Sequence, residues 1–185
     1  MHSGLIYRRA TVADADMLCA MMADQAVFGG LLQLPYPSAE TWRKRIEDTN
    51  AQPGNLNLLA VDTHGATAAV VGSAGIHGHG HSMRTRHVAG LGISVAKQWQ
   101  RRGIGSELMR RLLDFADNWV GYLRLELQVY TDNEAGMSLY RKFGFAQEGT
   151  LRANALREGR FVDSHLMARL HPQPPQLTPA ASTAP

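Results

Sequence analysis

The stretch that most constrains this chain is residues 98–119, "QWQRRGIGSELMRRLLDFADNW". Two arginines run into a Gly-Ile-Gly turn, and an amphipathic pattern follows directly. Its apolar residues recur three or four positions apart, the spacing of one buried helix face. They are Ile104, Leu108, Leu112, Phe115 and Trp119. The stretch therefore predicts a helix over 104–119 that begins at a glycine-rich turn.

The start of such a helix attracts anions because its first backbone N–H groups are unpaired and the helix dipole is positive there. Gly103 and Gly105 have no Cβ, so phosphate oxygens can approach their backbone closely. Side-chain donors flank the same position, namely Arg101, Arg102 and Ser106. We call residues 101–106 the glycine turn and predict that it binds a phosphate or pyrophosphate group.

Two other phosphate-binding motifs do not fit this stretch. The chain contains no G-x-x-x-x-G-K-[ST], which excludes a Walker A loop. A dinucleotide-binding turn requires a third glycine where Leu108 stands, and its first glycine follows a strand directly. Here "AKQWQRR" lies between Val95 and Gly103.

The rest of the sequence predicts strands and helices in mixed order. Apolar alternation and flanking turn residues predict strands at 5–10, 55–62, 69–78, 87–95 and 122–130, with a hairpin over 149–170 turning near Glu158-Gly159. Capping residues and helical spacing predict helices after Asp14 or Asp16, after Ser38, and over 133–145 before Gly144. Segment 27–38, "VFGGLLQLPYPS", is predicted to be irregular because two glycines and two prolines interrupt it.

Composition fits one globular domain, with 44% apolar and 19% charged residues. We predict that this domain spans residues 1–170 and that the proline-rich tail 171–185 is disordered. The single cysteine, Cys19, excludes an intrachain disulfide and a cysteine-based zinc site. The net charge of +3 is spread along the chain, so we expect no nucleic-acid partner. No apolar run approaches the ~18 residues of a membrane span, so we expect a cytoplasmic protein without a membrane partner.

Two motifs, placed within the predicted order of strands and helices, resemble those of the GCN5-related N-acetyltransferase (GNAT) superfamily. "QRRGIG" matches its signature [QR]-x-x-G-x-[GA], and "TDNEAGMSLYRKFGF" resembles its second hallmark, an Asn after the fifth strand and a Tyr seven positions later. Within the superfamily, "LQLPYPS", "DNW" and "ALREGRFVDSHLMAR" are most similar to YhhY-type L-amino-acid N-acetyltransferases. The resemblance implies an α+β fold (mixed α/β sandwich): a mostly antiparallel, twisted sheet, splayed between strands 4 and 5 and flanked by helices.

The resemblance also implies acetyl-CoA as co-substrate, with no metal. The glycine turn, Ile104 included, is implied to hold the pyrophosphate. The edge of the fourth strand, Ile93, Ser94 and Val95, is implied to pair with the pantetheine arm, and its backbone N–H groups can steady an oxyanion. Asn133 caps a helix, hydrogen-bonds the coenzyme, or does both.

Tyr140 occupies the superfamily's usual general-acid position. A phenol pKa near ~10 against a thiol pKa of ~8.5 makes proton donation to the departing thiolate feasible, although packing of the ring is the alternative. Glu126 is the first candidate for the general base, but an Arg-paired structural carboxylate is equally compatible with the sequence. Asp163, His87 and a water chain are weaker candidates.

The predicted irregular segment 27–38, the acceptor loop, falls where the superfamily places the connection that faces the acceptor. It carries apolar side chains, among them Phe28, Leu34 and Tyr36, and no carboxylate to pair with a polycation. We therefore expect a small-molecule amine acceptor with an apolar group, such as a free amino acid, unless the loop only packs against the core or a second subunit. A protein N-terminal or lysine acetyltransferase and a non-catalytic acyl-CoA-binding module are the alternatives.

Residues 77–81, "HGHGH", have the histidine spacing of a metal-binding tract on a strand. The tract spans a predicted turn and has no carboxylate or cysteine beside it. We therefore expect no functional metal at this tract. Separately, we expect the protein to form a homodimer.

Overall fold

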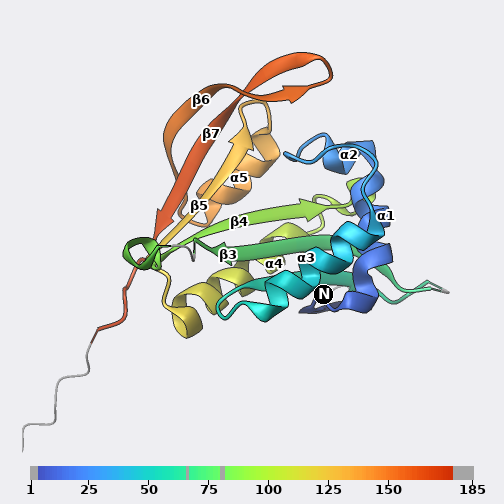
Figure 1. Cartoon of the computed structure of the whole chain (residues 1–185), viewed down its shortest axis with the longest axis horizontal. Coiled ribbons are helices and arrows are strands. Elements are labelled where there is room, and N and C mark those ends of the chain that lie inside the picture. The colour runs from blue at the N-terminus through green and yellow to red at the C-terminus, as the bar shows by residue number, and fades with distance from the viewer. Residues whose placement is uncertain (1–3, 66, 80–81, 177–185) are drawn as a thin grey trace, which may run out of the picture.

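A computed structural model describes residues 4–65, 67–79 and 82–176, and Figure 1 shows its architecture. The strands are β1 (Leu5–Arg9), β2 (Leu56–Asp62), β3 (Ala69–Gly78), β4 (Val88–Val95), β5 (Arg124–Tyr130), β6 (Ala146–Arg157) and β7 (Arg160–Leu170). The α-helices are α1 (Ala15–Ala23), α2 (Gln25–Phe28), α3 (Ala39–Ala51), α4 (Ile104–Asp114) and α5 (Glu134–Lys142). Short 3-10 helices cover Val12–Asp14, Met83–Thr85 and Lys97–Trp99. The predicted order of strands and helices is confirmed, with the four-residue α2 added at the start of the acceptor loop.

One seven-stranded sheet, in the order β1-β2-β3-β4-β5-β7-β6, carries all the strands. Every neighbouring pair is antiparallel except β4 and β5, which run parallel. These two strands pair only from Val88↔Arg124 to Gly90↔Glu126 and then separate. Among the described residues, 91–95 of β4 have no strand partner on that side. The predicted fold class is confirmed, including the splay between strands 4 and 5.

Helices cover both faces of the sheet, with α1 and α3 on the near face in Figure 1 and α4 behind it. Leu18, Met22 and Ile46 pack from the near side against Leu59 and Val61 of β2. On the far side, α4 buries an apolar stripe against the alternate residues of β3 and β4. The chain's two hydrophobic cores therefore lie on opposite sides of one sheet.

The predicted helix over 104–119 is correct to Asp114 and then changes type. Residues Phe115–Val120 form a π-helical turn, in which the Gly121 N–H donates to the Ala116 carbonyl at 2.9 Å. Wider π-helical turns advance each residue by less than 100°, which rotates the following side chains away from the α-helical stripe. Ala116 is therefore fully buried, while Trp119, expected on the buried face, is 78% exposed.

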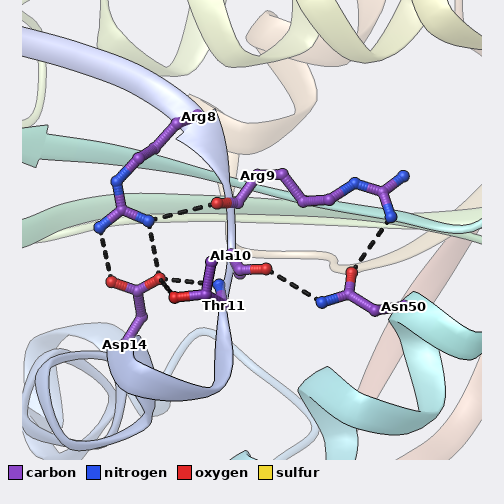
Figure 2. Close-up of polar contacts among 6 residues, drawn as sticks. All are labelled: Arg8, Arg9, Ala10, Thr11, Asp14 and Asn50. Atoms are coloured by element: carbon purple, nitrogen blue, oxygen red, sulfur yellow. Dashed lines mark hydrogen bonds and ion pairs between the residues drawn. The ribbon is translucent and has the colours of Figure 1, made fainter.

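The N-terminal strand is tied to the helix layer by a polar cluster, drawn in Figure 2. The Arg8 guanidinium donates two hydrogen bonds to the Asp14 carboxylate, at 2.7 and 2.6 Å. The Asp14 carboxylate also accepts hydrogen bonds from the backbone N–H and the hydroxyl of Thr11. These bonds close the turn that leads into α1. Asn50 of α3 bridges the same segment by donating to the Ala10 carbonyl at 3.1 Å.

We expect Asp14→Ala to lower the free energy of unfolding by about 2–4 kcal/mol, because it removes a buried carboxylate and its hydrogen bonds to Arg8 and Thr11. Asp14 is 1% exposed, and hydrogen bonds from Arg8 hold the pKa of its carboxyl down at about 2. In the unfolded chain the pKa of this carboxyl is near 4, so its lower pKa in the folded protein stabilises the fold by about 2 kcal/mol at pH values above 4. This contribution disappears as the pH falls from 4 towards 2. Denaturant unfolding at pH 7 and pH 3 measures both effects, with the exposed Glu47→Gln as control. Equal unfolding midpoints for Asp14→Ala and Glu47→Gln at pH 7 would contradict the assignment.

Candidate active site

The splay between β4 and β5 opens into a cavity with a volume of about 1180 Å³. We call it the main cavity. Its walls come from α3, the acceptor loop, β2 to β5, β7, and the segment Asn133–Tyr140. Because the sheet itself parts here, the cavity reaches from the α3 side of the sheet to the α5 side.

Glycines form the floor of the main cavity. Gly75 of β3 pairs with Gly92 of β4, and Gly90 pairs with Glu126 of β5, so these residues share the sheet face beneath α3. A Cβ built on Gly92 would meet nothing within 4 Å. The missing side chain of Gly92 therefore leaves open space, whereas the space above Gly75 is occupied by the side chains of Asn57 and His77. The alternating glycines of "AGLGIS" were the sequence signal for this floor, and the sequence reasoning missed it.

The unpaired edge of β4 presents backbone groups to the opening. The backbone hydrogen bonds of Val88 and Ala96 are formed on the β3 side of the strand, with His79 and Val71. The His87 carbonyl accepts on the β5 side, from the N–H of Leu123. Since a strand alternates its bonding direction, Ile93 and Val95 direct their N–H and C=O groups into the gap. The Val95 carbonyl accepts from the Gln100 side chain at 3.0 Å. Ser94 turns its backbone towards β3 and contributes its side chain to the main cavity.

The glycine turn lies beside the end of this edge. Gly103 immediately precedes α4 with a positive φ of 83°, a conformation that glycine adopts without strain. A Cβ on Gly105 would lie 3.8 Å from Val95 and 4.0 Å from Ile93. Arg101 and Arg102 are exposed, and the Arg102 guanidinium stacks 4.9 Å from the Trp99 ring centroid. Ser106 is half-buried in the first turn of α4.

A second cavity of about 330 Å³, the side cavity, connects these features. It is lined by Val95, Lys97 and Gln100 near the glycine turn, and by Asn133 and Arg157 across the opening. Ile93, Ser94 and Asn133 line both cavities. A ligand can therefore extend from the glycine turn along the edge of β4 into the main cavity. Asn133 also caps α5, accepting from the Gly136 N–H at 2.9 Å, so the helix-cap role foreseen for it is present.

Tyr140 lies on α5 and lines the main cavity while being only 6% exposed. Its ring packs edge-on against Phe145, with centroids 6.0 Å apart. Burial raises the pKa of the Tyr140 phenol from its ordinary value of 10.0 to about 12. The hydroxyl therefore stays protonated across the range in which enzymes normally operate, but it is a weaker acid than a free phenol.

Glu126 lines the main cavity where β4 and β5 part. Its Oε2 accepts from Arg124 at 3.0 Å, and Arg124 in turn pairs with Glu148. Its Oε1 lies 3.5 Å from His79 Nε2. The arginine pairing considered for Glu126 is therefore present at one oxygen, while the other oxygen faces a histidine.

The other candidate bases lie elsewhere. Asp163 accepts from the Ala153 N–H at 2.8 Å, and His87 is exposed; neither lines the main cavity. Two histidines that the sequence reasoning considered only as metal ligands, His77 and His79, do line it. Burial lowers the pKa of His77, which keeps its imidazole neutral. Gly80 and His81 of the histidine tract lie outside the described residues.

The acceptor loop closes one side of the main cavity through Gly30, Leu31, Leu32 and Gln33. The Tyr130 hydroxyl donates to the Leu31 carbonyl at 3.0 Å and so fixes the loop to β5. Of the side chains expected to contact the acceptor, Phe28, Leu34 and Tyr36 are not among those lining the cavity, and Leu34 and Tyr36 are 85% and 95% exposed. Their neighbours Leu31 and Leu32 occupy that position, because the chain turns outward after Gln33.

The described residues contain no group of three histidine, cysteine, aspartate or glutamate side chains that could hold a metal ion. None of the described helices combines the length and apolar character needed to cross a membrane.

The parted parallel strands β4 and β5, the glycine turn beside the end of β4 and the buried Tyr140 are the features that the sequence resemblance to an acyltransferase class implied. The profile described as "Acetyltransferase (GNAT) family" matches residues 25–145. The chain belongs to this family and is an N-acetyltransferase.

Two curated relatives and one solved structure show where in the family the chain lies. It is 36% identical over 168 residues to the L-amino acid N-acetyltransferase AaaT of Escherichia coli, covering 91% of this chain and 99% of the relative. It is 43% identical over 160 residues to the N-alpha-acetyltransferase RimI of Mycobacterium tuberculosis, covering 86% and 88%. The phosphinothricin acetyltransferase of Sinorhizobium meliloti, solved with acetyl-CoA, has the same fold, with a TM-score of 0.81 at 20% identity over 98% of this chain and 96% of that one. The YhhY-type resemblance is thereby confirmed.

Proposed function

We propose that this enzyme transfers the acetyl group of acetyl-CoA to the amine of a free L-amino acid with an apolar side chain. The observation that carries this proposal is the main cavity, which combines an apolar wall at Leu31 and Leu32 with a carboxylate, Glu126, beside the parted strands. The AaaT relative, an L-amino acid N-acetyltransferase along nearly its whole length, supports the same substrate class.

The residues present fit acetyl-CoA. The first amides of α4 and the positive φ of Gly103 form an anion-binding turn for the pyrophosphate. Arg101, Arg102 and Ser106 add donors around this turn, which also contains Ile104 and Gly105. The backbone groups of Ile93 and the N–H of Val95 offer the pantetheine amides a strand edge, while the Val95 carbonyl already accepts from Gln100. Asn133, which lines both cavities, lies along the same route.

Transfer requires a neutral amine, a polarised thioester carbonyl and a stabilised thiolate. Glu126 accepts the ammonium proton, directly or through water, and the freed amine attacks the thioester carbon. The backbone N–H groups at the β4 edge stabilise the oxyanion that forms. The Tyr140 hydroxyl then donates a hydrogen bond to the departing thiolate, and the second proton, which the attacking nitrogen loses as the tetrahedral intermediate collapses, ends on that thiolate to give the free thiol. Full proton transfer from a phenol with a pKa of about 12 to a thiolate of pKa near 8.5 is uphill by roughly 5 kcal/mol, so the hydrogen bond is its main contribution.

A panel of the free L-amino acids, assayed by thiol release from acetyl-CoA, tests the substrate proposal directly. We expect the highest kcat/KM for apolar side chains of the size of leucine, methionine or phenylalanine. Absence of turnover with all of these would remove the substrate proposal.

We expect Glu126→Gln to lower kcat/KM by about 100-fold at pH 7, because a general base in this position contributes 10²–10⁴-fold. The loss should shrink as the pH rises towards the pKa of the acceptor amine, since solvent then supplies neutral amine. Measuring kcat/KM from pH 7 to 10 checks this slope. Asp163→Asn, which leaves the main cavity unchanged, is the control. A loss of equal size at every pH would assign Glu126 a structural role.

Acetylation of a protein N-terminus is the second candidate, because the RimI relative is 43% identical over most of both chains. Peptides with free N-termini, assayed beside the amino acids, separate the two. Higher kcat/KM for the peptides would select the second candidate.

The assembly we propose is a cytoplasmic homodimer that acts without nucleic acid or membrane. Exposed apolar side chains on the β6–β7 hairpin, Leu156 at 65% and Phe161 at 74%, support self-association. Light scattering coupled to gel filtration measures the mass directly.

A further inference from the structure

Helix α3 presents one cationic side chain to the main cavity. Trp42, Arg45, Asp48 and Thr49 lie on one face of α3 and line the cavity wall. Arg45 is the only lysine or arginine among the described lining residues. Its guanidinium carbon lies 5.0 Å from the Trp42 ring centroid, a stacked position that orients the planar group.

Arg45 also has its hydrogen-bonding capacity available. In the described part of the chain it forms no ion pair, although Asp48 lies three residues further along the same helix face. Arg43, on another face of α3, differs: it pairs with Glu40 at 3.2 Å and with Asp16 at 3.3 Å. Two arginines of one helix are therefore used differently, one to join α3 to α1 and the other directed at the cavity.

We infer that Arg45 binds the α-carboxylate of the acceptor. This inference rests on the proposed acceptor class and adds the group that recognises it. A zwitterionic amino acid needs an anion for its ammonium group and a cation for its carboxylate. The main cavity supplies Glu126 for the first and Arg45 for the second, with Leu31 and Leu32 for an apolar side chain. The guanidinium donates to a carboxylate through two parallel N–H groups, and its stacking on Trp42 reduces the freedom lost on binding.

This arrangement selects among amines. A free amino acid satisfies Arg45, whereas a peptide N-terminus places an amide where the carboxylate would lie, and a polyamine places a methylene chain or a second cation there. Amines without a carboxylate therefore leave the guanidinium unpaired.

The test uses two matched ligands, N-acetyl-L-leucine and N-acetyl-L-leucinamide. Both lack the ammonium group and the reactive step, and they differ only at the carboxylate. Calorimetry with the CoA-saturated enzyme measures each Kd. We expect the wild type to bind the acid about 10–100-fold more tightly than the amide, the size of a charge-assisted pair. Arg45→Gln should bring the two Kd values within about threefold, while Arg43→Gln should retain the wild-type ratio.

Equal affinity of the wild type for acid and amide would overturn the inference, and so would an unchanged ratio in Arg45→Gln. A wild-type preference for the acid that depends on Arg45, together with no acetylation of any amino acid, would keep the carboxylate site and remove the proposed function. Acetylation of amino acids with no acid preference would do the reverse.

Discussion

Tyr140→Phe is expected to lower kcat by about 100- to 1000-fold, the cost of removing one hydrogen-bond donor that stabilises charge in the transition state. The substitution removes one hydroxyl from a buried ring and leaves its packing against Phe145 in place. The Kd for acetyl-CoA should therefore stay within about threefold of the wild type. Single-turnover kinetics and calorimetry measure the two quantities separately.

The pH profile gives a second readout of Tyr140. A hydrogen-bond donor must be protonated, and this phenol is protonated below its pKa of about 12. We therefore expect no fall of kcat attributable to Tyr140 between pH 7 and 10. Tyr7→Phe is the matched control. Tyr7 lies on β1, an edge strand of the sheet separated from β4 by β2 and β3, so this change should leave kcat unchanged. If Tyr140→Phe keeps wild-type kcat, the residue only packs. If the wild type binds acetyl-CoA and turns over no amine, the chain is the acyl-CoA-binding module considered as an alternative.

Gly105→Val is expected to weaken acetyl-CoA binding by about 100-fold, the cost of overfilling a site by two or three carbon atoms. The Cβ itself has room, because its nearest neighbour, Leu139, lies 3.4 Å away at ordinary contact distance. The added methyl groups project between α5 and the end of β4, where the route from the glycine turn into the main cavity passes. The fold should therefore tolerate the change better than the ligand does.

Two measurements separate these effects. The free energy of unfolding of Gly105→Val should fall by no more than about 1 kcal/mol, because the better helix propensity of valine offsets part of the cost of the added carbon atoms near Leu139. Gly149→Val on β6, where a Cβ meets nothing within 4 Å, places the same side chain far from the glycine turn and should keep wild-type affinity. Unchanged affinity of folded Gly105→Val would place the coenzyme elsewhere and contradict the proposed site.

Local signals in the sequence predicted the features that depend on near neighbours. Strand 69–78 is observed as Ala69–Gly78, and the hairpin turns at Glu158 and Gly159, both with positive φ. Asn133 caps its helix as its position suggested. The prediction for the helix after the glycine turn was wrong only beyond Asp114. The change from α-helical to π-helical spacing there depends on contacts of Ala116 and Tyr122, which lie outside the local pattern.

The acceptor side of the site was less accessible from the sequence. His79, which follows β3, and Glu126 of β5 meet over Gly90 of β4, and the Tyr130–Leu31 hydrogen bond joins residues 99 positions apart. Which side chains of the acceptor loop enter the cavity follows from that hydrogen bond and from the outward turn after Gln33. Neither leaves a periodic signal, so Leu34 and Tyr36 were expected where Leu31 and Leu32 stand.

The sequence alone determined the order of the elements and the glycine turn, because hydrophobic period, capping and glycine conformation act over a few residues. The family followed from the resemblance of two short motifs to known members. Only the tertiary structure decided which residues form the walls of the main cavity. There, strand register brings Gly75, Gly90 and Gly92 to one face, and the parting of β4 from β5 gives Glu126, Arg45 and Tyr140 a common space. Contacts of that kind depend on which distant segments pack together, and the chain's local pattern does not encode them.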